Sequence, residues 1–145
     1  MKSITIILFA FFTTINSFSQ SKKNIFFDQK TLTSKFHTID ELEDLRKGEL
    51  VKLYIERTNE ILTILPYIAL TNEPGISLSD IGIKENSDNL KVLDKHHEST
   101  SDSFTVTSDM ITEFVPYADT EKIIWSILYF EEVIKKIRIG VNGNF

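Results

Sequence analysis

The chain has 145 residues, 41% of them hydrophobic and 26% charged, which suits one globular domain with its own core and argues against global disorder. Asp and Glu (21) outnumber Lys and Arg (16), and the resulting net charge of −5 repels phosphate backbones and disfavours nucleic-acid binding. The sequence contains no cysteine, which excludes disulfides, cysteine nucleophiles and thiolate metal sites.

Residues 1–19 follow the three-part pattern of a secretory signal peptide. Lys2 provides the positive start, residues 4–12 are apolar apart from one threonine, and small serines precede the cut that we expect between Ser19 and Gln20. We therefore expect an exported chain, periplasmic or extracellular, with a bacterial source favoured. The apolar run is about half of the ~20 residues that a membrane helix needs, so no membrane span is expected in the mature chain. An uncleaved N-terminal anchor is the alternative.

Residues 20–37 show no helical period and predict an extended arm. We expect Phe26 and Phe27 of this arm to dock on a helical domain formed by residues 38–139. Residues 140–145 are predicted to be a loose tail.

The first helix is predicted to begin at Thr38, where Glu41 completes the capping-box pattern three residues later. Apolar residues then recur at steps of three and four, which predicts one helix of about 27 residues with a slight irregularity at Gly48. These residues are Leu42, Leu45, Leu50, Leu53, Ile61, Ile64 and Ile68.

A short connector helix is predicted after the first long helix. Pro74-Gly75 is typical of a type II turn, in which glycine takes the positive φ. Ser77 and Asp80 then have the spacing of a helix cap, and Gly82 is placed to end the turn.

The second long helix is predicted from residue 88 to Phe114, on a seven-residue repeat. The repeat is apolar at its ends and polar in its middle: Leu90, His97, Phe104 and Ile111 occupy one position, and Leu93, Thr100, Thr107 and Phe114 the other. Because residues 98–107 are poor helix formers, a break near Ser101 is the alternative.

The last helix is predicted to begin after Asp119 and to end at Gly140, about 19 residues long. Its first half is apolar on nearly every side, which is typical of a helix buried between two neighbours. We therefore expect Trp125 to be well buried.

Together these segments predict an all-α fold, an antiparallel three-helix bundle with Pro-terminated or kinked helices and a short connector helix. Proline cannot donate a backbone hydrogen bond, so Pro66 and Pro116 should each end or kink a helix. In an antiparallel bundle the pairs Pro66-Tyr67 and Pro116-Tyr117 should close opposite poles, with the tyrosines at the rim. An internal duplication is the alternative explanation of the repeated pair.

The sequence carries no motif of a known catalytic or cofactor site. It has no glycine-rich phosphate loop, no HExxH motif and no GxSxG elbow. Adjacent His96 and His97 would point about 100° apart on a helix, so they cannot chelate one ion. The carboxylate pairs Asp40/Glu41 and Glu131/Glu132 are expected on the surface or in caps. We expect no metal, no cofactor and no enzymatic activity.

One polar group falls inside the predicted core. Arg57 stands in the apolar stripe of the first helix, at a depth similar to that of His97 and Thr100 on an antiparallel second helix. We predict a polar layer of Arg57, His97 and Thr100 between these helices. The alternative is an Arg57 that extends outward and pairs with Glu60.

These features favour an exported helical protein without enzymatic activity that binds another protein: an inhibitor, an immunity-like protein or an envelope-assembly factor. The candidate binding residues are Arg57, His97, Thr100, Tyr67 and Tyr117. The second hypothesis is a carrier of a small molecule or lipid, with Phe104 and Trp125 lining a pocket between the helices. A small enzyme of unknown reaction is third. The sequence indicates neither the partner nor the oligomeric state.

Overall fold

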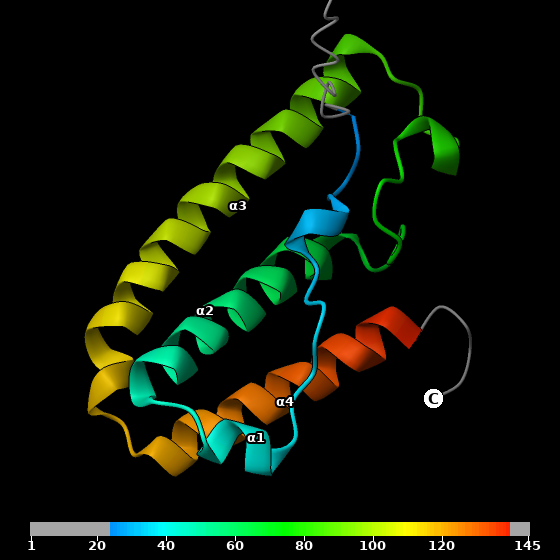
Figure 1. Ribbon diagram of the computed structural model, residues 1–145. Helices are drawn as coiled ribbons and strands as arrows, with labels where there is room; N and C mark the ends of the chain where they lie inside the picture. Colours follow the sequence, from blue (N-terminus) through cyan, green and yellow to red (C-terminus); the bar gives the residue numbers. More distant parts are fainter. Residues whose placement is uncertain (1–23, 140–145) are drawn as a thin grey trace, which may run out of the picture.

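The computed structural model describes residues 24–139, which are mostly helical and contain no strand, only an isolated bridge between Ile25 and Ser77 (Figure 1). The predicted all-α class is confirmed. The predicted signal peptide and the predicted tail lie outside the described residues. The helices, with 3-10 turns written η, are η1 (Gln29–Thr31), α1 (Ile39–Glu43), α2 (Lys47–Ile64), η2 (Leu65–Tyr67), η3 (Ser79–Ile81), α3 (Ser87–Phe114), η4 (Val115–Tyr117) and α4 (Thr120–Ile139).

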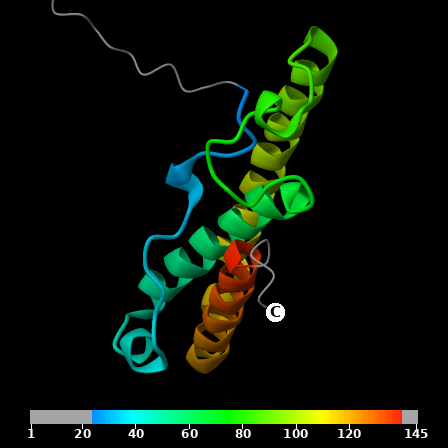
Figure 2. The same ribbon diagram turned by 90° about the vertical axis from the view of Figure 1, so that its right-hand side faces the viewer.

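Helix α2 lies at the centre of the molecule and contacts both α3 and α4. The chain runs up α2, down α3 and back along α4, while α3 and α4 diverge from the turn that joins them (Figure 1). The arm crosses α2 and also reaches α4, where it bonds Glu131 and Arg138 (Figure 2). No helix among residues 24–139 is long and apolar enough to cross a membrane.

The predicted first helix is two helices, because the chain bends at residues 44–46. The predicted capping box is confirmed: Thr38 accepts from the Glu41 amide and Glu41 accepts from the Thr38 amide. A second capping pair then starts α2, where the Glu49 carboxylate accepts the amide hydrogen of Arg46 at 2.9 Å. The bend lies before Gly48, and Leu42 of α1 and Leu50 at the start of α2 belong to the same apolar cluster.

The connector follows the sequence prediction. Gly75 and Gly82 have φ of 79° and 81°, the left-handed region that favours glycine. The Ser77 amide donates to Asp80 at 2.8 Å, and Gly82 caps the 3-10 turn η3.

Helix α3 is continuous through residues 98–107, so the alternative of a break near Ser101 is wrong. Its threonines turn inward to the helix backbone: Thr105 and Thr107 donate to the carbonyls of Ser101 and Ser103 at 3.0 and 2.7 Å. These bonds satisfy the hydroxyl groups locally.

Both Pro-Tyr pairs end a helix in the same way, as predicted. Pro66 and Pro116 each sit in a 3-10 turn directly after α2 and α3. The two turns lie at opposite ends of α2 and belong to different core clusters, so the predicted opposite poles are confirmed (Figure 1). Neither tyrosine lies at the rim of the core as predicted, because Tyr67 is buried and Tyr117 is 87% exposed.

The core consists of two apolar clusters along α2. The upper cluster joins the arm to the end of α2, to α3 and to the end of α4, and it confirms the predicted docking of Phe26 and Phe27. The lower cluster joins α1, the start of α2 and the start of α4 around the buried residues Leu42, Leu50, Ile123, Ile124 and Ile127.

The predicted burial of Trp125 is wrong, since this side chain is 63% exposed. Helix α4 buries one face, on α2, α1 and the arm. Because α3 diverges from α4, the opposite face with Trp125 and Tyr129 has no neighbour among the described residues.

Candidate functional site

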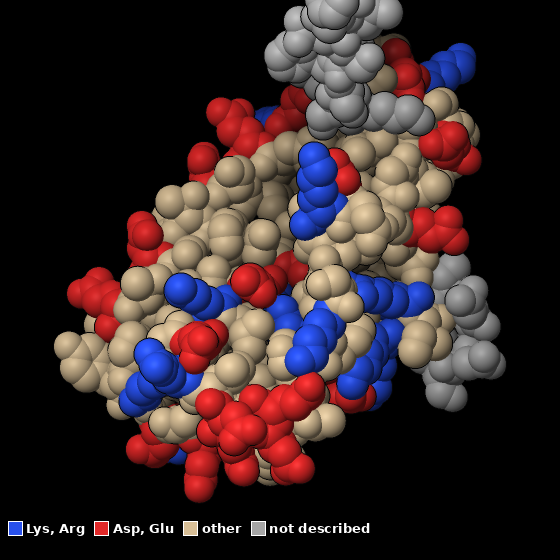
Figure 3. Space-filling model, viewed as in Figure 1, with Lys and Arg blue, Asp and Glu red and all other residues tan. Residues whose placement is uncertain are grey.

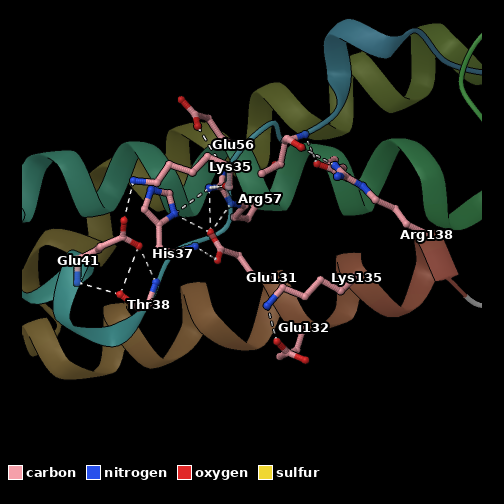
Figure 4. A network of polar contacts seen from close by, with 12 residues as sticks. Lys35, His37, Thr38, Glu41, Glu56, Arg57, Glu131, Glu132, Lys135 and Arg138 are labelled. Carbon is pink, nitrogen blue, oxygen red and sulfur yellow. Dashed lines mark hydrogen bonds and ion pairs between the residues drawn. The ribbon is translucent and has the colours of Figure 1, made fainter.

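A buried ion pair connects α2 to α4 at the centre of the molecule (Figure 4). Arg57 of α2 is 3% exposed and donates from Nε and Nη2 to Glu131 Oε1 at 3.0 and 2.9 Å. The arm completes this group, because the His37 amide donates to Glu131 Oε2 at 2.7 Å and its ring Nδ1 lies 2.9 Å from Oε1. Arg57 Nη2 also donates to the carbonyl of Lys35 at 3.0 Å.

A second buried carboxylate, three residues after Arg57 on α2, also holds the arm. Glu60, with no exposed surface, accepts the amide hydrogen of Thr33. Arg138 of α4 donates to Glu60 Oε1 from Nε at 3.1 Å and to the Thr33 carbonyl at 2.9 Å. Its guanidinium also lies over the Phe36 ring, 5.1 Å from the centroid.

Each of these two groups, which we call arm clamps, pairs a buried carboxylate with an arginine and with arm backbone. A buried charge is costly unless it is paired and hydrogen-bonded, and both glutamates meet this condition. The clamps therefore fix residues 33–37 in one position on α2 and α4.

The first clamp forms the wall of a cavity of about 440 Å³ between the arm and α2. The cavity wall is mostly polar, with Lys30, Lys35, His37, Glu56 and Arg57 as its titratable residues. Hydroxyl and amide groups of Thr31, Thr33, Ser34 and Asn59 supply further hydrogen-bonding atoms.

Two more cavities lie on either side of Tyr67. One of about 310 Å³ separates α2 from α3 and is lined by Tyr67, His97, Thr100 and Phe104 among others. The other, of about 220 Å³, is apolar and lies between α3 and the connector, with Leu70, Leu78 and Ile83 in its wall. Three candidate residues of the sequence analysis thus share one cavity.

Tyr67 and the two adjacent histidines form a hydrogen-bonded group beside these cavities. The Tyr67 hydroxyl lies 2.6 Å from His96 Nδ1, and burial raises the pKa of Tyr67 to about 12. His97 Nε2 donates to the Phe26 carbonyl at 2.9 Å, since a carbonyl can only accept. Both histidines therefore hold α3 against the rest of the fold. His96 contacts Tyr67 at the end of α2, and His97 bonds the arm.

The predicted polar layer of Arg57, His97 and Thr100 is wrong in composition. Arg57 faces α4 and the arm, while His97 and Thr100 line the cavity on the α3 side. The alternative pair of Arg57 with Glu60 is also wrong, because Arg57 is buried on Glu131 and Glu60 bonds Arg138.

The two carboxylates that hold the arm, Glu131 and Glu60, are not recognisable as site residues from the sequence. Glu131 was expected on the surface, but it is 1% exposed. Its position in the sequence does indicate burial, because Glu131 is four residues after Ile127 and three before Ile134, on the buried face of α4. Neither Glu131 nor Glu60 could be matched to its arginine, since those partners lie 74 and 78 residues away in sequence.

A separate feature is the exposed apolar surface of the α3–η4–α4 hairpin, which we call the aromatic hairpin. It consists of two stripes with side chains 47–87% exposed: Val106, Met110, Phe114 and Tyr117 on α3 and η4, and Trp125 and Tyr129 on α4. Val106, Met110 and Phe114 are four apart, as are Trp125 and Tyr129, so each set lies on one side of its helix. Tyr117 is the candidate residue that lies here, far from Tyr67.

Charge is unevenly distributed over the surface. Figure 3 shows Lys and Arg side chains in a band where the arm crosses α2 and α4, with Asp and Glu gathered below, over α1. Within residues 24–139, no group of three or more His, Asp or Glu side chains is arranged to hold a metal ion.

Comparison of the chain with protein-family models, with curated proteins and with solved structures finds no match.

Proposed function

We propose that this chain is an exported, non-enzymatic helical module that binds another protein through its aromatic hairpin. The observation that supports this is the exposure of Phe114, Tyr117, Trp125 and Tyr129 on one helical hairpin. Tryptophan, tyrosine, phenylalanine and methionine are the residues enriched at protein interfaces, and they supply most hot spots. A surface that exposes these side chains together is typical of an interaction site.

The charge of the hairpin favours a basic partner. Between residues 105 and 129 the exposed charged residues are the acidic Asp109, Glu113, Asp119 and Glu121 and the basic Lys122, a net charge of −3. These acidic residues speed association with a positively charged protein and disfavour binding to an anionic lipid surface. We therefore propose an apolar patch with basic surroundings as the complementary surface.

The binding test compares two exposed positions on α3 and α4 in the source cell. A photo-reactive phenylalanine derivative replaces Trp125 in one variant and Val92, 70% exposed at the far end of α3, in the other. We expect one discrete adduct from position 125 that is absent from position 92. The captured protein is then purified, and its Kd should rise at least tenfold with Tyr129→Ala.

Three results would overturn this proposal. Equal adducts from both positions would show non-specific contact, and an adduct of twice the chain mass would show that the hairpin binds a second copy. A Kd unchanged by Tyr129→Ala and by the double charge reversal Glu113→Lys/Glu121→Lys would exclude the hairpin as the interface.

Export is proposed on the signal-peptide pattern of residues 1–19. The mature protein should have the intact mass of a chain starting at or beside Gln20, and it should be recovered outside the cytoplasm. An intact mass that includes Met1 would contradict cleavage. As to the finer fold, we propose an antiparallel three-helix bundle that is closed by the arm on one side.

A second candidate function, a small-molecule carrier, is favoured by the cavity of about 310 Å³ between α2 and α3. Phe104 lines this cavity as expected, whereas Trp125 lies on the outer face of α4. Native mass spectrometry of the protein purified from its source would separate the two functions. A retained small ligand that is lost on Phe104→Trp favours the carrier; a bare chain favours the protein-binding module.

A further inference from the structure

We propose that the cavity between the arm and α2 is a binding site for a small organic carboxylate, and that the Glu56 side chain occupies the carboxylate position when no ligand is bound. This site is separate from the aromatic hairpin. Three features support it: Arg57 has both fixed and replaceable partners, the cavity is lined mainly by basic charged residues, and its volume suits a small ligand.

Arg57 is held on one side by fixed partners. Its Nε and Nη2 atoms donate to Glu131, which is 1% exposed, and to the backbone carbonyl of Lys35. These bonds cannot be exchanged without moving α4 or the arm. They set the plane of the guanidinium and turn its Nη1 edge toward the cavity.

The partner of this Nη1 edge is replaceable. Arg57 Nη1 donates to Glu56 Oε2 at 3.3 Å, and the Glu56 side chain is 64% exposed. This contact contributes little, because it is long and water competes for the exposed Glu56 carboxylate. The contact nevertheless shows that a carboxylate reaches this position, so a carboxylate from a ligand can take the place of Glu56.

The other charges of the cavity favour an anion once Glu56 has moved out. Glu56 is the one acidic residue in the lining, whereas Lys30 and Lys35 also line it. Lys35 pairs with Glu41 at 2.9 Å, but both side chains are more than 40% exposed. Figure 3 shows further Lys and Arg side chains in the band where the arm crosses, and these add positive charge near the arm.

The rest of the cavity suits a small polar molecule. Its volume of about 440 Å³ lies in the usual range for ligand sites. The side chains of Ser34 and Asn59 line it and have no hydrogen bond to any residue within 24–139. They are therefore available to a hydroxyl or carbonyl group of the ligand.

The test titrates the full protein with acetate, lactate and succinate, with acetamide as the neutral control and inorganic phosphate as a competing anion. The readout is the NMR shift of the Arg57 Nε–H and of the His37 ring. We expect saturable shifts with at least one carboxylate and none with acetamide. Glu56→Gln should tighten binding up to about fivefold, because it removes the competing carboxylate from the cavity. Lys30→Gln should weaken binding up to about fivefold.

The matched control is Glu43→Gln, which makes the same charge change at an exposed position on α1 and should leave the affinity unchanged. The proposal is overturned if no carboxylate saturates the shifts in the wild type and in Glu56→Gln. It is also overturned if Glu43→Gln has the same effect as Glu56→Gln, or if phosphate binds more tightly than every carboxylate. None of these outcomes depends on the protein partner of the hairpin, so the two proposals fail separately.

Discussion

Arg57 shows how one side chain can be indispensable without stabilising the fold on balance. We expect Arg57→Met to destabilise the protein by about 3–5 kcal/mol, because it leaves Glu131 charged and buried without its arginine. The double variant Arg57→Met/Glu131→Leu should recover most of this loss. Urea denaturation measures both changes, with Lys52→Met on the exposed side of α2 as the control. Equal stability of the single and double variants would contradict the pairing.

Trp125 gives an independent test of the exposed hairpin. On the sequence pattern alone, Trp125→Ala would cost roughly 3–5 kcal/mol as a core substitution. With 63% of the side chain exposed, we instead expect a change within about 0.5 kcal/mol. Trp125 is the single tryptophan of the chain, so native fluorescence reports on it alone. Emission should be red-shifted and readily quenched by acrylamide; blue-shifted, protected emission would place it under a partner surface or in a core.

At the scale of elements, the stability that the capping box gives to α1 depends on pH. The Thr38 amide and the nearby Lys35 lower the pKa of Glu41 to about 2. A lowered carboxyl pKa contributes stability that is present above its usual value near 4.3 and is lost as the pH falls through about 2. Glu41→Gln should therefore destabilise the fold at neutral pH and have much less effect at the acid end of this window, because glutamine resembles the protonated carboxyl.

The measurement for this prediction is thermal unfolding at neutral and acid pH, together with an NMR titration of Glu41. Glu98→Gln, at an exposed position within α3, is the control and should show no such pH dependence. Equal destabilisation by Glu41→Gln at both pH values would show that the charge of Glu41 does not contribute to the cap.

The elements themselves were largely predictable because their signals are local. The Pro-Tyr ends of α2 and α3, the glycine turns of the connector and the Thr38 cap depend on a few neighbouring residues. The bend between α1 and α2 was missed because an apolar period continues through it, and the period alone cannot tell one helix from two that share a cluster.

The site was less predictable, for a physical reason. The period of α4 marks which residues are apolar, but burial depends on which neighbours are present. Because α3 diverges from α4, Trp125 lies outside, and because the arm returns over α2, Glu60 and Glu131 lie inside. Such pairings join residues far apart in sequence, which no local pattern records.

For the whole molecule, the arm should behave as part of the folded core. The Thr33 and His37 amides donate to buried glutamates, although neither residue is in a helix. We expect both amides to exchange with deuterium about as slowly as those in the middle of α2, since opening them requires a buried carboxylate to lose its partners. Arg138→Gln should speed exchange at Thr33 more than at His37. Fast exchange at both sites in the wild type would show that the arm detaches independently.

The arm clamps also impose an order on folding. The bond from His37 to Glu131 spans 94 positions and the bond from Arg138 to Thr33 spans 105, so both close loops almost as long as the described chain. Contacts of this separation form late, after local helices, because the loop entropy is lost before any contact compensates for it. A chain that is still emerging from the ribosome lacks α4 and cannot complete either clamp. The arm can therefore close on α2 and α4 only after the last helix has been released.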